Sequence, residues 1–325
     1  MSRLAACIDL MERDHVDVLL LGREANARTV TAVSRLWLAG TRAFAPGCVV
    51  VRRSAAVHVL ANTDAVVATD FPVEHLFGIT WNPEKLLASL TAIDGVRGAR
   101  RVAVDGMNPA LATLVARAMP GAEIVDAGPL FAELWRTADS ETTSGVERAA
   151  LVARVGLAAM VDALRPDVGP GVLRGACAAA FAAYGVTTPA FEAVAAPLDA
   201  GTSTWLSPER ALVEGERVVL RAGALRDGCE ASLARTYVIG SPSVERPAPA
   251  GWDELVAACV AGATTGALRR RGATVHGAGR GVEAWPDDLV LVPGLTAAIE
   301  YRDDAGVRQD VVRVTDAAPV LVTNP

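Results

Sequence analysis

Residues that can do chemistry are concentrated in the second half of the chain, where one histidine stands out. His15, His58 and His75 show no spacing typical of metal ligands. His276 lies in the segment Val-His-Gly-Ala-Gly. An imidazole with an ordinary pKa of about 6.5 suits proton transfer near neutral pH, so His276 is a candidate catalytic base. The alternative is a hydrogen-bonded histidine in a loop.

The cysteines offer little further chemistry. Their number is odd and no Cys-x-x-Cys motif is present among Cys7, Cys48, Cys177, Cys229 and Cys259. This usage favours reduced thiols in a cytoplasmic protein. A nucleophilic cysteine needs a neighbouring base, and none is evident beside Cys229. We therefore expect Cys229 to behave as a small hydrophobic residue.

Residues 215–236 carry the most specific pattern and read GERVVLRAGALRDGCEASLART. This segment resembles one in the creatinase, prolidase and methionine aminopeptidase superfamily, whose fold is called pita-bread. The matching residues are those of the scaffold, namely Gly223, Gly228, Arg235 and Thr236. Family members have two metal-binding aspartates in this segment. Arg221 and Ser232 stand at those two positions.

The same resemblance covers the other ligand positions of the family. His276 stands at the position of a ligand histidine, and Glu300, after the Pro-Gly turn at 293–294, at that of a ligand glutamate. Gln309 replaces a second ligand glutamate. Trp205 replaces a histidine that is the general base in creatinase and contacts substrate in the peptidases. Three of the five metal ligands are thus replaced.

The replacements are coherent in charge. The family's four carboxylates are balanced by two divalent cations, whereas Arg221 and Glu300 carry opposite charges and Ser232 and Gln309 carry none. A paired guanidinium can offset the cost of burying a carboxylate. We therefore predict a site without metal or other cofactor, in which Arg221 and Glu300 face each other, either within hydrogen-bond reach or bridged by one ligand or water.

Two functions are compatible with this pattern. The first is a metal-independent, creatinase-like enzyme acting on a C–N bond of a small amino-acid-derived or peptide-like substrate. His276 and Glu300 would then move protons, and the substrate would be bound by Arg221, Arg235, Trp205, Ser232 and Gln309. The second is a non-catalytic pseudopeptidase that binds a ligand or protein partner, with Arg221 and Glu300 as a structural plug. An ordinary Xaa-Pro aminopeptidase is disfavoured because most metal ligands are missing.

Composition sets the wider limits. The 325 residues predict two domains, and a hydrophobic fraction of 51% supplies large cores. A net charge of −6 argues against nucleic-acid or anionic-membrane partners. The sequence has neither an apolar run of membrane-spanning length nor a signal-peptide pattern at its start, which favours the cytoplasm. The family resemblance implies a homodimer.

The predicted fold is α/β (α+β), with a domain boundary between residues 140 and 141. The first domain is a small α/β layer with helices at 3–14, 83–91 and 109–118 and strands at 17–22, 48–51, 56–60, 101–105 and 124–126. Val16-Asp17, Asn26 and Ala39-Gly40 resemble the N-terminal domain of creatinase.

The second domain is predicted to be a pita-bread domain with a curved antiparallel sheet. Its expected helices are 145–164, one within 164–185, and 252–271. Asp227-Gly228 predicts a hairpin between strands 217–222 and 231–239. Further strands are expected at 289–292, 296–301, 307–314 and 320–323.

Overall fold

The computed structural model describes residues 2–323 except 32–46, 61–70, 79, 81, 107, 137–138, 188, 199–202, 209 and 280–284. Ala39 and Gly40 of the N-terminal resemblance lie outside the described residues. The chain divides into two compact units, Met1–Thr137 and Ala138–Pro325. Among the described residues, each unit contains hydrophobic core clusters of its own.

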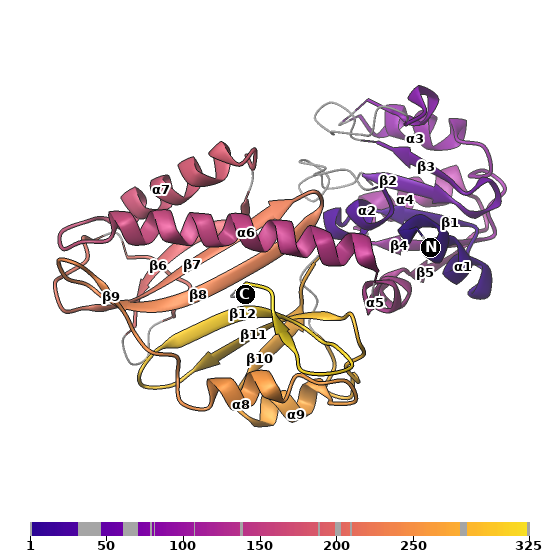
Figure 1. Cartoon of the computed structure of the whole chain (residues 1–325). Helices are drawn as coiled ribbons and strands as arrows, with labels where there is room; N and C mark the ends of the chain where they lie inside the picture. Colours follow the sequence, from indigo (N-terminus) through magenta and orange to yellow (C-terminus); the bar gives the residue numbers. More distant parts are fainter. Residues whose placement is uncertain are drawn as a thin grey trace. The chain divides into compact units, whose positions relative to one another are not determined.

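The first unit is an α/β layer around a five-stranded sheet of order β3-β2-β1-β4-β5 (Figure 1). Strands β1, β4 and β5 are parallel, whereas β2 and β3 run antiparallel to their neighbours. The strands are β1 (Val18–Leu21), β2 (Cys48–Val51), β3 (Ala56–Val59), β4 (Arg101–Asp105) and β5 (Glu123–Asp126). The helices are α1 (Arg3–Arg13), α2 (Glu24–Thr31), α3 (Pro83–Ala92), α4 (Pro109–Ala118) and α5 (Gly128–Arg136).

Alternation along β1 explains the two layers of the first unit. Successive side chains of a strand point to opposite faces of the sheet. Leu19 and Leu21 accordingly join the core formed with α1 and α5, whereas Val18 and Leu20 join the core formed with α3 and α4. Because helices cover both faces of the sheet at β1, the residues of this strand are all apolar.

The second unit is built on a larger sheet of order β10-β11-β12-β8-β7-β6, in which all named strand pairs are antiparallel. Its main strands are β6 (Pro189–Pro197), β7 (Arg217–Arg226), β8 (Cys229–Val238), β10 (Thr274–Gly277), β11 (Thr296–Arg302) and β12 (Val307–Arg313). Short strands β9 (Val244–Glu245) and β13 (Val320–Leu321) pair with β8 and β12. The helices are α6 (Ser140–Ala163), α7 (Pro170–Ala183), α8 (Trp252–Ala257) and α9 (Thr265–Arg270).

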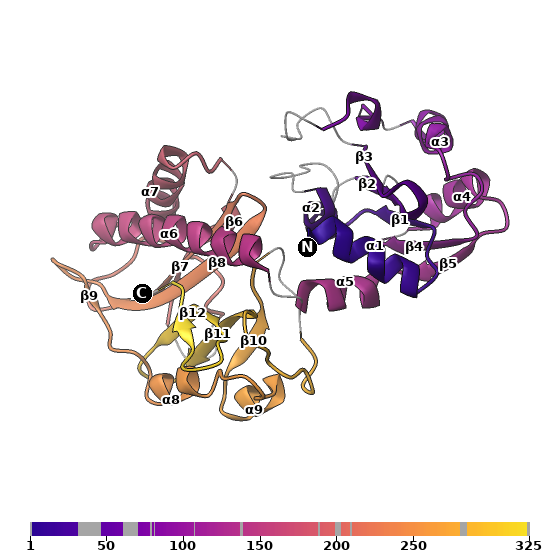
Figure 2. The same ribbon diagram turned by 45° about the vertical axis from the view of Figure 1, so that its right-hand side comes forward.

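Helices cover the outer face of this sheet in two groups. Figures 1 and 2 show α6 and α7 beside β6–β8, and α8 and α9 beside β10–β12. Residues of α6 and α7 pack against Leu220, Ala222 and Leu233, whereas α8 and α9 pack against Ile299 and Val312. Curved antiparallel strands with helices outside are the predicted pita-bread architecture, and this prediction is confirmed.

Three predicted boundaries are corrected by local chemistry. Helix α6 begins at Ser140, not at Gly145, because the Asp139 side chain accepts a hydrogen bond from the Thr142 amide at 2.7 Å. The single helix expected at 252–271 is two helices, since Gly262 adopts a φ of 86° and Thr264 caps α9. Residues 289–292 form no strand and make only an isolated bridge at Val290.

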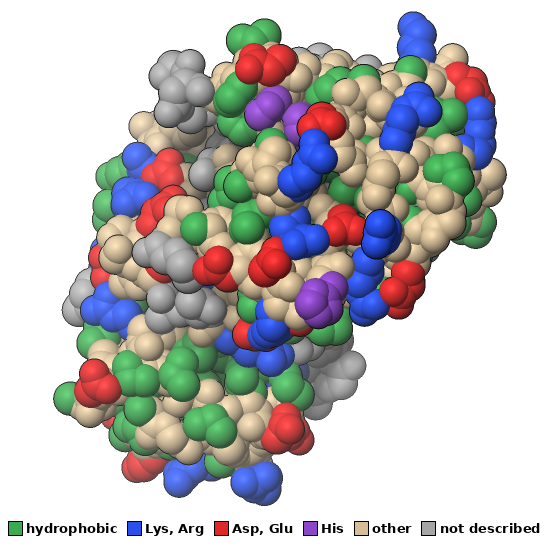
Figure 3. All heavy atoms as spheres, turned by 90° about the vertical axis from the view of Figure 1, so that its right-hand side faces the viewer, with side chains coloured by type: hydrophobic (Ala, Val, Ile, Leu, Met, Phe, Trp, Pro, Cys, Tyr) green, Lys and Arg blue, Asp and Glu red, His purple; other side chains and the backbone are tan. Residues whose placement is uncertain are grey.

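The apolarity of the helices and the distribution of surface charge are relevant to possible partners. No helix of the described residues combines the length and apolarity that crossing a bilayer would require. Figure 3 shows one face of the molecule, where Lys and Arg side chains are interspersed with Asp and Glu. Exposed pairs of this kind, such as Arg117 with Glu84, contribute little to stability.

Candidate functional site

A row of four residues crosses the inner face of the second sheet. Arg221 on β7 lies opposite Ala234 on β8, which lies opposite Gln309 on β12. Gln309 in turn lies opposite Glu300 on β11. Directly opposed residues of antiparallel strands project from the same face, so the four side chains share one side of the sheet. Because the side chain of Ala234 is small, the side chain of Arg221 can extend past it to residues of β12 and β11.

Arg221 uses all five of its N–H donors within this network. Its Nη1 donates to Glu300 Oε2 at 2.6 Å and to Gln309 Oε1 at 2.9 Å. Its Nη2 donates to Glu300 Oε1 at 3.1 Å and to Thr204 Oγ1 at 3.0 Å. The remaining donor, Nε, bonds to the Thr204 carbonyl at 3.0 Å. A guanidinium has five donors and no acceptor, so no hydrogen-bonding capacity is left for a ligand.

The network is buried. The Arg221 side chain is 0% exposed and that of Glu300 is 17% exposed. Two parallel bonds between a guanidinium and a carboxylate form the strong fork geometry that suits ion pairs in the interior. Gln309 extends the network, because its Nε2 donates to Ser232 Oγ at 2.8 Å. The expected contact of Arg221 with Glu300 is therefore confirmed, while the functional roles of both residues stay predictions.

The aromatic ring of Trp205 stacks on the guanidinium of Arg221. The Arg221 Cζ lies 4.1 Å from the centre of the Trp205 ring, a cation–π arrangement. Phe191 of β6 meets the same ring edge-on at a centroid distance of 5.3 Å. Trp205 remains 44% exposed, so its outer face is in contact with solvent. The stacked indole completes the enclosure of the Arg221 guanidinium.

Arg235 lies on the opposite side of the sheet from Arg221. It pairs in register with Leu220, one position out of step with Arg221, and lines a cavity beside Leu157 and Val161 of α6. Its Nη2 donates to the fully buried Asp310 at 2.7 Å and its Nη1 to the Gln309 carbonyl at 2.9 Å. Arg235 therefore does not share a pocket with Arg221 and holds β12 against β8.

His276 lies on β10, not in a loop, and is half-buried. Its Nδ1 lies 3.0 Å from the Gly277 carbonyl oxygen. Together with Ser232 it lines a small cavity of about 30 Å³. Since a water molecule needs roughly 10–15 Å³ of such volume, the cavity has room for about two waters and for no larger ligand. The structure thus brings His276 and Ser232 to one cavity and Arg221, Glu300 and Gln309 to one network.

The described residues do not fit the pair of metal ions that the fold implies. A permanently charged guanidinium occupies the centre of the ligand positions, and it binds both oxygens of Glu300. A divalent cation at these positions would lie next to the like charge of that guanidinium. Among the residues that the structure describes, no three His, Cys, Asp or Glu side chains gather in a way that could hold a metal ion.

Two contributors escaped sequence reasoning. Thr204 supplies two acceptors to Arg221 from a segment without regular secondary structure, so no periodicity indicates it. Asp310 neutralises Arg235; it is the last of three consecutive polar residues, 308–310, so strand periodicity did not indicate that it is buried. Cys229 is buried against α6, as expected for a small hydrophobic residue. Its thiol lies 3.9 Å from the Thr142 carbonyl oxygen.

Comparison with solved structures places this geometry in a known fold. The chain resembles a dipeptidase from Pyrococcus horikoshii OT3 with a TM-score of 0.75 and 18% identity, over 99% of this chain and 98% of the other. It resembles the prolidase of the same organism with a TM-score of 0.73 and 15% identity, over 100% and 98%. For the X-Pro aminopeptidase of Thermotoga maritima MSB8 the values are 0.71 and 12%, over 100% and 98%.

Sequence comparison adds no closer relationship. No protein-family model matches the chain, and no curated protein matches it. Identities between 12% and 18% show the fold and leave the activity open. Both halves of the chain are covered by these likenesses, so the small α/β unit belongs to the shared architecture as well. The chain therefore has the pita-bread fold of the prolidases, Xaa-Pro dipeptidases and X-Pro aminopeptidases.

Proposed function

We propose that this chain is a metal-independent, non-catalytic pita-bread protein that acts by binding. The observation that carries the proposal is the closed hydrogen-bond set of Arg221, whose five donors all have protein acceptors. A guanidinium without a free donor cannot clamp a substrate carboxylate. Both oxygens of Glu300 accept hydrogen bonds from the same guanidinium, so this carboxylate is engaged in the ion pair.

Electrostatics supports independence from metal. Arginine stays protonated at all physiological pH values. A divalent cation next to Arg221 would meet a like charge in an interior where Coulomb interactions are weakly screened. The network is also already neutral, because the charge of Arg221 is balanced by that of Glu300. Metal binding would therefore have to break the strongest contacts of the site.

The competing function is a creatinase-like hydrolase that uses His276 and Ser232. Such an enzyme needs a substrate-sized cavity beside the imidazole. The space that these two residues line measures about 30 Å³, far below the roughly 300–1,000 Å³ of typical small-molecule pockets. The size of this cavity favours the non-catalytic function.

A restoration experiment tests the proposal. Wild-type protein should contain no stoichiometric Mn, Co, Zn or Fe by elemental analysis, and its Tm should not respond to Mn²⁺ or to a chelator. The triple variant Arg221→Asp/Ser232→Asp/Gln309→Glu restores the carboxylates of the fold's metal site. Its Tm should rise with Mn²⁺ concentration, because a ligand that binds only the folded state stabilises it.

Activity assays complete the test. Wild-type protein should hydrolyse neither Xaa-Pro dipeptides nor creatine, with or without added Mn²⁺ or Co²⁺. Tightly bound metal in the wild-type protein would refute metal independence. Turnover that disappears in a His276→Ala or Glu300→Gln variant that is still folded would establish the competing enzymatic function.

A further inference from the structure

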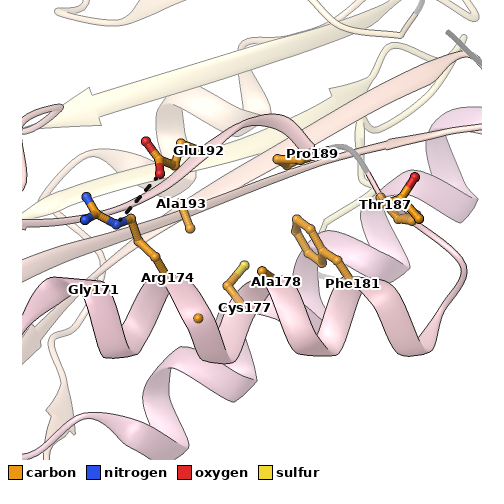
Figure 4. A pocket seen from close by; sticks show the side chains of 11 residues that line it. Gly171, Arg174, Cys177, Ala178, Phe181, Thr187, Pro189, Glu192 and Ala193 are labelled. Carbon is orange, nitrogen blue, oxygen red and sulfur yellow. Dashed lines mark ion pairs between the residues drawn. The ribbon is translucent and has the colours of Figure 1, made fainter. Parts of the chain in front are cut away.

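A second cavity lies away from the Arg221 network, between helix α7 and edge strand β6. Its volume is about 430 Å³. Figure 4 shows the side chains that line it. We call it the α7–β6 groove, and its apolar lining comes mainly from Cys177, Ala178, Phe181, Val186, Pro189 and Ala193. Its volume lies within the range of small-molecule pockets. Burial raises the pKa of Cys177 to about 12, so the thiol serves as neutral, apolar lining.

The groove is open because glycine occupies its wall. Gly175 lies in the middle of α7, and a Cβ atom added there would meet no heavy atom within 4 Å. Glycine is among the least favourable residues in a helix interior, second only to proline. A larger side chain would fit at this position, favour the helix and partly fill the groove. Glycine at position 175 leaves this space unfilled.

Opposite charges stand at the mouth of the groove. Figure 4 shows Arg174 of α7 and Glu192 of β6 facing each other across one end. Their closest nitrogen and oxygen atoms are 3.9 Å apart, beyond hydrogen-bond distance. Both side chains are accessible, at 40% and 82% exposure. A ligand that carried only one charge would be attracted by one of these groups and repelled by the other.

From this arrangement we infer that the α7–β6 groove binds a zwitterionic apolar amino acid. Its carboxylate bonds to Arg174, its ammonium group bonds to Glu192, and its apolar side chain enters the groove. This site lies outside the Arg221 network and does not depend on the proposed function. Charge complementarity to both rim groups, together with the apolar lining, distinguishes this ligand class from fatty acids and from amines.

Calorimetry with a small ligand series tests the chemistry of the site. L-leucine and L-phenylalanine should bind. N-acetyl-leucine lacks the ammonium charge, leucinamide lacks the carboxylate, and glycine lacks the apolar group. Each of these three should bind at least about tenfold more weakly, since one charged hydrogen bond or one buried side chain is worth roughly that factor or more.

Variants locate the binding. Gly175→Leu should abolish leucine binding and keep the protein folded. Ala179→Leu is the matched control, because Ala179 is an exposed residue of the same helix outside the groove lining, and it should bind as the wild type does. Arg174→Gln should weaken leucine binding at least about tenfold, whereas leucinamide, which has no carboxylate and is repelled by the Arg174 charge, should bind no more weakly than to the wild type. Absence of leucine and phenylalanine binding at millimolar concentration, undiminished binding by Gly175→Leu, or equal binding of N-acetyl-leucine would overturn the inference.

Discussion

Arg221 is stable in the protein interior because every hydrogen-bond donor has a partner and its charge has a counter-charge. Burying a charge is costly unless it is paired and hydrogen-bonded. Glu300 supplies the charge, Thr204 and Gln309 supply the neutral acceptors, and Trp205 supplies an aromatic face. The contribution of each partner therefore depends on the presence of the others, as in other buried networks.

Replacing Glu300 by Gln should destabilise the second unit by about 3–5 kcal/mol, because it leaves an uncompensated guanidinium in the interior. Chemical unfolding gives the change in unfolding free energy. Glu147→Gln is the matched control, since Glu147 pairs with Arg313 at the surface with 51% exposure. That substitution should cost at most about 1 kcal/mol. Equal effects of the two variants would contradict the interpretation that Arg221 and Glu300 form a structural plug.

The lowered pKa of His58 predicts that the stability of the first unit depends on pH. Burial, and then the nearby His75, lowers its pKa to about 4, and its ring lies 4.3 Å from that of His75. The unfolded chain, with an ordinary pKa of about 6.5, therefore takes up the proton first as pH falls. Stability from this residue is complete above about pH 6.5 and is lost toward pH 4, by up to roughly 3 kcal/mol.

The check compares wild type with His58→Phe in chemical unfolding between pH 4 and pH 7. The phenyl ring keeps the burial and removes the titration. The pH dependence of the first unit's unfolding free energy should become shallower in the variant over this window. Identical slopes for the two proteins would show that His58 does not titrate differently in the folded and unfolded states.

Single residues of the candidate site were predictable where a sequence motif surrounds them. Arg221, Glu300 and Gln309 lie on regular strands, so the resemblance fixed their register and their mutual contact. Trp205 was predicted to bind substrate, and its stacking on Arg221 was not anticipated. Its position, like that of Thr204, depends on an irregular segment whose path no local pattern encodes.

At the scale of elements, close helix packing explains another glycine. Gly156 of α6 lies where α7 crosses, and a Cβ atom there would come within 2.2 Å of Phe181 and 2.8 Å of Cys177. Real side chains do not tolerate such distances, so the two helices approach only because position 156 lacks a side chain. Gly175 on α7 faces open space instead. The two helical glycines therefore predict opposite responses to the same substitution.

Gly156→Ala should destabilise the second unit by about 1–3 kcal/mol, because overpacking outweighs the gain in helix propensity. Gly175→Ala should stabilise it by up to about 1 kcal/mol, since only the propensity term acts. Thermal and chemical unfolding of both variants measure these changes. If Gly156→Ala also stabilised the protein, the contact between α6 and α7 would be looser than described.

Elements were predictable where local chemistry agrees with the fold. The Asp227-Gly228 turn adopts φ values of 51° and 73°, the left-handed pair that a two-residue hairpin needs, and the hairpin of β7 and β8 forms as expected. Strand β6 was not predicted, because its pairing with β7 is shifted twice and its start is proline. Tertiary pairing, not periodicity, defines that strand.

At the scale of the whole molecule, the two units have separate interiors. Among the described residues, the first unit has two hydrophobic core clusters of its own and the second unit has four. A unit whose core is its own can fold alone. The likenesses to solved structures cover the residues of both units.

A fragment of residues 138–325 should therefore fold cooperatively and keep the Arg221 network. The residue at which the fragment begins matters, because Asp139 caps α6 by accepting a hydrogen bond from the Thr142 amide. The boundary predicted from the sequence starts the second domain at residue 141 and so excludes this cap. A fragment of residues 141–325 lacks the cap and should be less stable by about 1 kcal/mol. Circular dichroism during thermal unfolding measures both. If the longer fragment stays unfolded, the first unit contributes to the stability of the second, and the separation of the cores does not describe how this chain folds.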